Sequence, residues 1–513
     1  MQKEENAAMI MIQGTSSHAG KSTVATALCR IFSQKNFKTA PFKSWNMSLN
    51  STVTKSGGEI GIAQAVQAQA AGVEAEVEMQ PILVKPEGEG KSQVIIKGEP
   101  LLKKNRTLKK DYYHKGLKVI EESLNYLKEK YEVIVLEGAG SPVEINVKDK
   151  DLANMKIAKL NNTPVILVAD IERGGVFASI VGTMELLSAE ERELVAGFII
   201  NKLHGDSSVL KSGIDYLEKR YGIPVLGVLP YIHNSYLPEE DAVALSEVKV
   251  KGENNFKDKL KICVLKLPHI SNFTDFAALE SDSRVILNYS LKKSIIKEAD
   301  VIIIPGTKNT ISDLKYLKDN NIDKLLTEMV KENKKIIGIC GGYQMLGEKL
   351  KDPQGVEGKR RSVSGIGLLA LETIFTKKKS TNLVEASVLT NKGIFEELKG
   401  EKVEAYEIHL GYSKIKANEL DSTVSIFKVI KRSGEKVDER DGFINAEKNV
   451  WGSYFHGLFN NDMFREKFIT MLLNKKENHL ESYEEKINNS FNRLAQLFEE
   501  NIDMEKLREV IFR

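Results

Sequence analysis

The sequence predicts an α/β protein with two doubly wound domains, each built on a mostly parallel β-sheet. The chain has 513 residues, which is too long for a single hydrophobic core. Short apolar segments recur in both halves, and each ends in a polar or glycine-rich loop, the pattern of parallel strands that share one carboxyl edge. A strongly polar stretch separates the halves. We therefore expect domains at residues 1–236 and 260–470, a linker at 237–259 and a helical tail at 471–513.

The composition excludes several classes of protein. The 74 basic and 71 acidic residues leave a net charge of +3, which gives no electrostatic reason for nucleic acid or an anionic membrane to be the main partner. Cys29, Cys263 and Cys340 are too widely spaced for a disulfide framework or a cysteine-based zinc site. No apolar run approaches the roughly 20 residues that span a bilayer, and the N-terminus does not resemble a signal peptide. A soluble cytoplasmic protein is expected.

The first apolar segment, residues 8–12, leads into a phosphate-binding loop. The loop reads GTSSHAGKST and is followed by a segment of helical periodicity. In such Walker A-like loops, glycines and backbone N–H groups cradle phosphates, the lysine neutralises them and a hydroxyl ligates Mg²⁺. The first glycine stands one place early, with Thr15 in its usual position. The expected ATP-binding residues of the loop are Gly14, Thr15, Gly20, Lys21, Ser22 and Thr23.

Two further strand ends complete the predicted nucleotide site. Lys43 follows the strand expected at residues 38–42, so it lies on the same carboxyl edge and is a further ATP-binding candidate. Glu137 ends the strand expected at residues 131–136, where a magnesium–nucleotide site needs a carboxylate; a structural cap is the alternative. Ser22 and Glu137 are the expected Mg²⁺ ligands.

Three polar segments of the first half have two interpretations each. The loop at residues 44–51, which contains Asn46, either binds substrate or is a solvated loop. The alanine- and glutamine-rich segment 59–71 favours a closely packed helix, compatible with a subunit contact in a homo-oligomer, over a ligand contact. Asp151 either caps a helix or supports a site. Asn46 and Asp151 are therefore candidates for active-site support.

In the second half, the segment IIGICGGYQML at residues 336–346 predicts a nucleophile. An apolar strand delivers Cys340 into a Gly-Gly turn, and a segment of helical character follows. This strand–turn–helix elbow exposes a side chain at the carboxyl end of a parallel strand. The helix N-terminus behind Cys340 favours the thiolate, which is the nucleophilic form. A buried core cysteine is the alternative interpretation.

A cysteine nucleophile needs a base and an oxyanion site. His456 follows a short strand and precedes a glycine, and it is favoured as the base over His409. His479 lies in a charged helical segment and is expected to face solvent. The strand expected at residues 300–304 ends in a Pro-Gly turn, whose backbone N–H groups at Gly306 could join that of Gly341 as an oxyanion hole.

With these features together, the second half resembles class I, or triad-type, glutamine amidotransferase domains. In that family a cysteine thiolate attacks the side-chain amide of glutamine and releases ammonia through a glutamyl thioester. The resemblance implies that Gly306, Gly341 and Gln344 bind glutamine or its oxyanion. The family usually carries H-x-E, and here Leu458 stands in place of the glutamate. The site is therefore expected to run on a Cys–His pair, as in the cobyric acid and cobyrinic acid synthase branch.

The first half is similar to dethiobiotin synthetase, which has the same shifted phosphate loop, a lysine like Lys43 and a V-E-G-A-G strand end like residues 136–140. Motifs along nearly the whole chain resemble the cobyric acid synthase family. They are QGTSS, NMSLNS, EIG, DLANM, RGGVF and YEIH, at residues 13–17, 46–51, 59–61, 151–155, 173–177 and 406–409. One minor departure is Ala405, which stands where a glycine usually precedes YEIH.

This resemblance implies ATP- and glutamine-dependent amidation of the b, d, e and g side-chain carboxylates of adenosylcobyrinic acid a,c-diamide, in cobalamin biosynthesis. It implies ATP, Mg²⁺, glutamine as nitrogen donor and a corrinoid substrate, with Asn46 and Asp151 as candidates to support the corrinoid. The alternatives are cobyrinic acid a,c-diamide synthase, a CTP synthetase-like enzyme, and a nucleotide-switch or partitioning ATPase with an inactive cysteine domain. The Asn46 and YEIH motifs argue against the first, and the absent H-x-E glutamate against the second.

Overall fold

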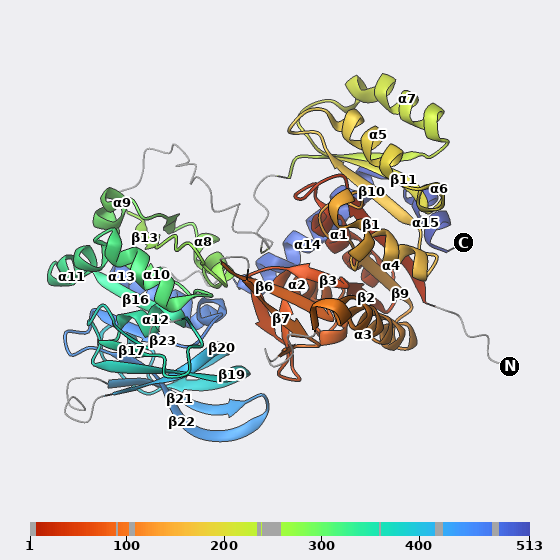
Figure 1. Cartoon of the computed structure of the whole chain (residues 1–513). Helices are drawn as coiled ribbons and strands as arrows, with labels where there is room; N and C mark the ends of the chain where they lie inside the picture. The colour runs from red at the N-terminus through yellow and green to blue at the C-terminus, as the bar shows by residue number, and fades with distance from the viewer. Residues whose placement is uncertain are drawn as a thin grey trace.

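The computed structural model forms two lobes (Figure 1). The predicted linker lies almost wholly outside the described residues, and His479 lies outside them too. The structure describes residues 7–88, 91–101, 108–232, 238, 258–358, 361–415, 424–474 and 482–512.

A six-stranded sheet in the order β12-β11-β10-β1-β9-β2 forms the centre of the first domain. Its strands are β1 (Ala8–Gly14), β2 (Thr39–Phe42), β9 (Val133–Glu137), β10 (Val165–Asp170), β11 (Val195–Leu203) and β12 (Val225–Pro230). Every pair of neighbours is parallel. The strands are apolar along most of their length because both faces of the sheet are covered. The predicted doubly wound parallel sheet is confirmed.

Helices cover both faces of this sheet. Side chains alternate between the two faces along each strand, so the sheet separates two cores. Met11 packs on one face, whereas Ile10 and Ile12 pack on the other. The first face carries α3 (Leu108–Lys130), α4 (Met155–Leu160), α5 (Val176–Leu186) and α7 (Lys211–Tyr221). The opposite face carries α1 (Lys21–Gln34), α14 (Tyr483–Asn501) and α15 (Met504–Ile511). The remaining short helices of this domain are α2 (Ile62–Ala70), α6 (Ala189–Glu193), η1 (Val77–Met79), η2 (Ile145–Lys150) and η3 (Ser207–Leu210).

The C-terminal helices α14 and α15 pack on the first domain, although they follow the second domain in sequence (Figure 1). Phe491 and Phe498 on α14 are buried in the same core as Leu28 on α1. The backbone N–H of Asp503 donates to Leu226 O on β12 at 2.7 Å. The apolar face of α14 needs cover, and the first domain supplies it. The sequence predicted a helical tail without placing it, and the chain in fact returns to the domain where it began.

Two small sheets lie between the main sheet of the first domain and the second domain. One has the order β3-β6-β7-β8, with β3 (Trp45–Met47), β6 (Ile82–Gly88), β7 (Lys91–Ile96) and β8 (Glu99–Pro100). The other pairs β4 (Ser51–Val53) with β5 (Glu59–Gly61). These insertions bring β4 against β19 and β20 of the second domain.

The second domain has one mixed sheet, in the order β14-β13-β15-β16-β23-β22-β21-β19-β17-β18, with β20 paired to β19. Its parallel part, which the sequence predicted, is β14 (Val285–Tyr289), β13 (Leu260–Val264), β15 (Val301–Ile304), β16 (Lys335–Ile339) and β23 (Val450–Ser453). The extension, which was not predicted, is β17 (Lys349–Lys351), β18 (Ser362–Ser364), β19 (Leu371–Val388), β20 (Lys402–Ile415), β21 (Val424–Arg432) and β22 (Glu435–Ile444). Most pairs in it are antiparallel.

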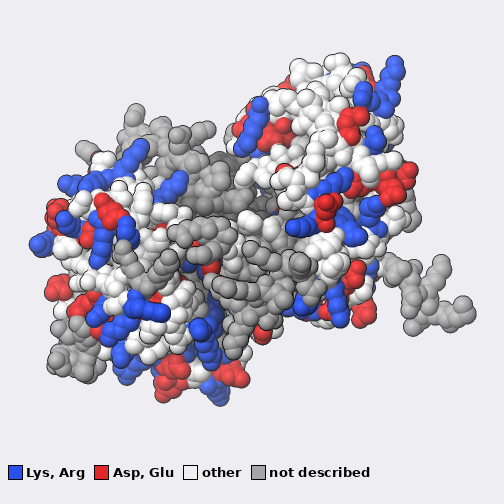
Figure 2. All heavy atoms as spheres, viewed as in Figure 1, with Lys and Arg blue, Asp and Glu red and all other residues white. Residues whose placement is uncertain are grey.

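The helices of the second domain are α8 (Ala277–Glu280), α9 (Lys293–Glu298), α10 (Thr310–Asp319), α11 (Ile322–Lys331), α12 (Gly341–Leu346) and α13 (Asp462–Leu473), with η5 (Phe273–Phe276), η6 (Gly393–Phe395) and η8 (Leu458–Asn460). In the described part of the chain, no helix has the length and apolar character needed to cross a membrane. Figure 2 shows basic and acidic side chains interspersed on the face it presents.

The packing of α14 makes a testable prediction. Phe491→Ala should destabilise the first domain by about 3–5 kcal/mol, because it leaves a cavity beside the central sheet. The chain has two tryptophans, Trp45 in the first domain and Trp451 in the second. In a Trp451→Phe background, urea unfolding followed by Trp45 fluorescence should shift to lower urea. Arg493→Ala, on the exposed side of α14, should shift it little. An unchanged Trp45 transition in Phe491→Ala would contradict this packing.

Candidate active sites

Cys340 sits in the elbow that the sequence predicts, between β16 and α12. Its backbone has φ 50° and ψ −107°, a strained conformation for a residue with a side chain. Its N–H donates to Ser453 O on β23 at 2.8 Å, which fixes the turn against the neighbouring strand. The turn also needs glycine, because a Cβ on Gly342 would lie 1.9 Å from Ile304 O. The strand–turn–helix geometry therefore holds Cys340 at the carboxyl edge of the parallel strands.

His456 follows β23, lies near Cys340 and is held by Asp275. The imidazole is buried and lines the same pocket as Cys340, whose Sγ lies 3.5 Å from Ile408 O. Its Nδ1 is 2.6 Å from Asp275 Oδ2, and the Gly457 N–H donates to Asp275 Oδ1 at 2.9 Å. Asp275 is buried in η5. Cys340, His456 and Asp275 are therefore grouped as the nucleophile, base and orienting carboxylate are in acyl-transfer sites.

This arrangement corrects the expectation of a Cys–His pair. Leu458 is buried and cannot replace the usual glutamate, but a carboxylate reaches the histidine from another part of the chain. Asp275 precedes His456 by 181 residues, in the polar loop that follows β13. No motif distinguishes that aspartate in the sequence. The one available signal was a polar loop at the carboxyl edge of a predicted parallel strand.

The two candidate bases, His456 and His409, have pKa values shifted in opposite directions. Burial alone would lower the pKa of His456, but the charges and hydrogen bonds of Asp275 and Cys340 raise it to about 10. His456 is therefore an imidazolium at neutral pH, suited to stabilise a thiolate. Burial lowers the pKa of His409 to about 4, so that ring is neutral. Its Nδ1 lies 3.0 Å from Gly411 O, and it stacks on Tyr454 at 3.8 Å between ring centroids. The geometry favours His456 over His409 as the base.

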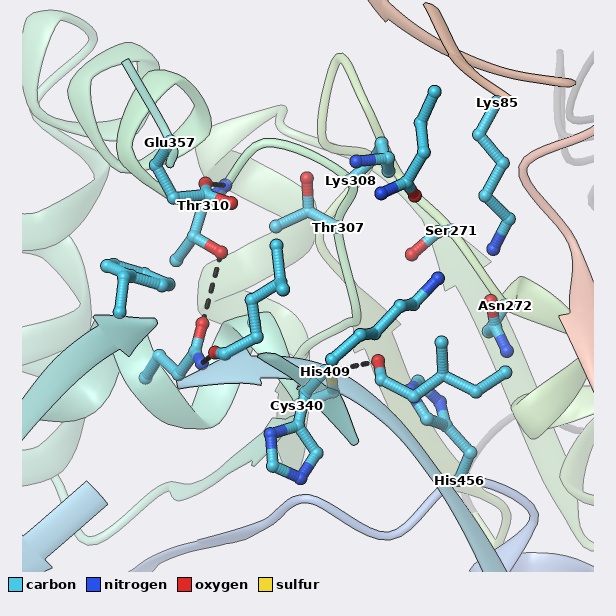
Figure 3. Close-up of a pocket in the computed structure, with 17 residues that line it drawn as sticks. Lys85, Ser271, Asn272, Thr307, Lys308, Thr310, Cys340, Glu357, His409 and His456 are labelled. Atoms are coloured by element: carbon cyan, nitrogen blue, oxygen red, sulfur yellow. Dashed lines mark hydrogen bonds between the residues drawn. The ribbon is translucent and has the colours of Figure 1, made fainter. Parts of the chain in front are cut away.

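A pocket opens over Cys340 and His456 (Figure 3). Gln344 lines it, and its amide is fixed by Leu410 O at 3.0 Å and by the Thr310 hydroxyl at 3.1 Å. Gly341 also lines the pocket, and a Cβ there would lie 3.2 Å from the Thr307 backbone nitrogen. A Cβ on Gly306 would lie 3.0 Å from His456 Cε1. The structure therefore brings all three predicted glutamine-binding residues close to the Cys340–His456 pair.

In the first domain, the predicted phosphate loop lies between β1 and α1. Lys21 is buried at the start of α1, and its Nζ donates to Ser16 O at 3.0 Å and to Gly140 O at 2.9 Å. The Thr15 N–H donates to Val168 O on β10 at 3.0 Å. The loop ends at Gly20, which has φ 101°. Gly14 ends β1, and Thr23 lies in the first turn of α1.

Glu137, at the end of β9, accepts hydrogen bonds from three neighbouring side chains. Its Oε1 accepts hydrogen bonds from the Ser22 hydroxyl at 2.8 Å and from Lys43 Nζ at 2.9 Å, and Gln67 Nε2 donates to Oε2 at 2.6 Å. Burial would raise the pKa of Glu137, but Lys43 and these hydrogen bonds hold it below its usual value. An ionised carboxylate beside a hydroxyl offers the hard oxygen donors that Mg²⁺ prefers. The predicted Lys21, Ser22, Lys43 and Glu137 thus lie together.

The glutamine-rich helix α2 packs closely, as the preferred interpretation expects, and it packs against α1 and β2 of the same chain. Gln67 reaches the carboxylate of the phosphate-binding site, so the less favoured ligand-side interpretation fits this residue better. Asn46 is also buried, with Nδ2 at 3.5 Å from Gln64 Oε1 on α2. Asp151 caps the chain before α4: its carboxylate accepts the N–H groups of Ala153, Asn154 and Lys156 at 2.8–3.0 Å.

The loop after Asn46 meets the second domain and is not a solvated loop. Asn50 and Ser51 are buried, and Phe273 N–H donates to Asn50 Oδ1 at 3.1 Å. Asn272 Nδ2 donates to Ser51 O at 2.7 Å and to the Tyr406 hydroxyl at 3.0 Å. Tyr406 stacks on His456 at 5.2 Å between ring centroids. These contacts lead directly from the first domain to His456.

Each of the two sites lies in a segment that matches a known protein family. Residues 261–464 match the family model of the CobB/CobQ-like glutamine amidotransferase domain, and residues 10–242 match that of the CobQ/CobB/MinD/ParA nucleotide binding domain. A cobyric acid synthase from Dehalococcoides mccartyi (strain CBDB1) is 43% identical, covering 98% of this chain and 99% of its own. The chain belongs to the cobyric acid synthase family.

Two further members of the cobyric acid synthase family are similarly close. The protein from Moorella thermoacetica is 46% identical over 90% of this chain and 88% of its own, and that from Clostridium botulinum is 44% identical over 98% and 99%. The family and the two matched domains make the chain an ATP-dependent glutamine amidotransferase, as the sequence predicted. The alternative of a nucleotide-switch ATPase is therefore wrong.

The Asp275–His456 contact makes a prediction for pH. Asp275→Asn should lower glutaminase kcat by about 10²–10⁴, because the imidazole loses the group that orients it. It should also lower the pKa of His456 from about 10 toward its ordinary value, so activity should fall as pH rises above neutrality rather than near pH 10. Steady-state glutamate release across pH 6–10 measures both effects. Asp319→Asn, exposed on α10, is the control. An unshifted alkaline limb in Asp275→Asn would contradict the assignment.

Proposed function

We propose that the chain amidates the b, d, e and g side-chain carboxylates of adenosylcobyrinic acid a,c-diamide, using ATP and ammonia from glutamine. The observation that carries the proposal is a Cys340–His456–Asp275 chain in one domain and a Lys21, Lys43, Ser22 and Glu137 cluster in the other. Its family supports the reaction, since relatives that match over nearly the whole chain are named cobyric acid synthase.

The second domain releases the ammonia. Cys340 attacks the side-chain amide carbon of glutamine, and the oxyanion that forms faces the backbone near Gly306 and Gly341. His456, as the imidazolium, gives its proton to the departing nitrogen, which leaves as ammonia and a glutamyl thioester. His456 then takes a proton from water as the water attacks the thioester, so glutamate leaves and the thiolate–imidazolium pair returns. Asp275 keeps the imidazole oriented through both steps.

The first domain activates the carboxylate. A carboxylate is a poor electrophile, and transfer of the γ-phosphoryl group of ATP to its oxygen creates an acyl phosphate. Lys21 and Lys43 neutralise the phosphate oxygens during transfer. Ammonia then attacks the acyl carbon, the amide forms and phosphate leaves. Ser22 and Glu137 would hold Mg²⁺, which neutralises further phosphate charge when bound.

The two half-reactions need each other. Free ammonia is mostly protonated at neutral pH, and the ammonium ion is not a nucleophile. Ammonia that passes from Cys340 to the first domain inside the protein avoids that protonation. The buried contacts of Asn50, Ser51 and Asn272 between the two sites support such direct transfer.

Replacing the nucleophile separates the two activities. Cys340→Ala should reduce glutamine-dependent amidation at least 10³-fold, because no thioester forms. Amidation supported by added ammonium chloride should remain within about threefold of the wild type, because the first domain is intact. Product masses after incubation with ATP and the corrinoid a,c-diamide measure both. A wild-type protein that releases no glutamate from glutamine under these conditions would contradict the proposal.

Replacing Lys21 of the phosphate loop should impair the ATP-dependent half of the reaction. Lys21→Met should lower amidation at least 10²-fold whether glutamine or ammonium supplies the nitrogen, because phosphoryl transfer loses its main neutralising charge. Phosphate release and product mass give the readout. Lys35→Met, just after α1 and paired with Glu499 at the surface, should leave both rates within about twofold. Retention of ammonium-dependent synthesis in Lys21→Met would count against the assigned site.

A further inference from the structure

A hairpin of the first domain forms part of the wall of the glutamine pocket in the second. Lys85 on β6 and Gln93 on β7 are directly opposite in the antiparallel register. Both side chains line the cavity that also contains Cys340 and His456. Figure 3 shows Lys85 and Glu357 at opposite edges of this pocket. The pocket is therefore assembled from two domains.

Lys85 belongs to a buried group with an excess of positive charge. Its Nζ lies 2.5 Å from Glu59 Oε1 and 2.6 Å from the Ser51 hydroxyl, and Lys379 of the second domain pairs with the other oxygen of Glu59. Glu59, Lys85 and Lys379 are each less than a tenth exposed. Two ammonium groups thus share one carboxylate away from water, an arrangement that leaves a site suited to a further anion.

The pKa values of Glu59 and Lys85 agree with an excess of positive charge in this group. Burial alone would raise the pKa of Glu59, but Lys379 and Lys85 hold it well below its usual range. Burial lowers the pKa of Lys85 to about 8, with Lys379 and Lys308 adding to the effect and Glu59 opposing it. Lys85 is therefore still mostly protonated at pH 7. Of the other charged groups on the pocket wall, Lys308 pairs with Glu87 at 3.1 Å. The half-buried Glu357 has its pKa raised to about 7, chiefly because its carboxylate is poorly solvated.

Gln93 contributes a second, independent observation. Its Oε1 is buried and has no hydrogen-bond partner among the residues that the structure describes. An unpaired amide oxygen in a buried position is costly, and a ligand donor would satisfy it. The hairpin therefore presents a cation and a hydrogen-bond acceptor at opposed positions. An α-amino acid carries the matching pair on its α-carbon, a carboxylate and an ammonium group.

We propose that the β6–β7 hairpin binds the α-carbon end of glutamine, with Lys85 contacting the α-carboxylate and Gln93 accepting from the α-ammonium, while the side-chain amide lies at Cys340. This assignment rests on the proposed function, since it names how that site selects its nitrogen donor. Neither domain alone then contains a complete glutamine site. Glutamine is hydrolysed only when the domain that uses the ammonia is docked.

Two analogues that each retain one α-substituent test the two contacts separately. Glutaramate keeps the carboxylate and lacks the ammonium, whereas 4-aminobutanamide keeps the ammonium and lacks the carboxylate. Their inhibition constants against glutamine hydrolysis are measured on the full-length enzyme. Lys85→Met should weaken glutaramate at least 10-fold and leave 4-aminobutanamide within about twofold. Gln93→Leu should do the reverse, and both variants should raise KM for glutamine.

Control measurements distinguish a failure of this glutamine-binding assignment from a failure of the proposed function. Ammonium-dependent amidation should stay near the wild-type rate in both variants, and Lys379→Met, on the other side of Glu59, should reproduce the Lys85→Met pattern. Lys55→Met, an exposed residue of the first domain paired with Glu74, should change nothing. Equal weakening of both analogues by either variant, or no weakening, would overturn the assignment. A wild-type enzyme without glutaminase activity would instead overturn the proposed function.

Discussion

The hydrogen bond of 2.6 Å between His456 Nδ1 and Asp275 Oδ2 is the contact on which the rest of the glutaminase site depends. It fixes the ring orientation, and the charge of Asp275 counteracts the cost of burying an imidazolium. The same loop carries Asn272 and Phe273, which hydrogen-bond to Ser51 and Asn50 of the first domain. The orientation of His456 and the docking of the domains are therefore linked through one short segment.

In the first domain, Glu137 likewise connects groups from several elements. One buried carboxylate accepts hydrogen bonds from a phosphate-loop hydroxyl, a lysine from the next strand end and a glutamine from α2. These groups come from distant parts of the sequence, and the parallel sheet brings them together because the carboxyl ends of its strands share one edge. Near the C-terminus, α14 covers one face of that sheet, so the end of the chain contributes to the core of the first domain.

The sequence predicted those features whose signal is local. The phosphate loop and the elbow at Cys340 each combine a buried strand, glycines and a helix start within a few residues, and both appear where expected. Asp275 could not be predicted as the third group, because it is one ordinary aspartate far from His456 in sequence. The docking of α14 and the reach of Lys85 into the second domain depend on tertiary contacts that no local pattern encodes. The antiparallel extension after α12 was not predicted, although the YEIH motif lies on β20, because a four-residue motif does not show which strand it pairs with.

The central claim is that ammonia released at Cys340 is consumed in the first domain without mixing with solvent. The most direct measurement is isotope competition, with glutamine labelled with ¹⁵N in its side-chain amide, ATP, the corrinoid a,c-diamide and an excess of unlabelled ammonium chloride at neutral pH. Mass spectrometry of the amidated product then reports the source of each nitrogen. Direct transfer predicts that nearly all new amide nitrogen carries ¹⁵N. A product labelled in proportion to the mixed pool of ammonia in solution would contradict it.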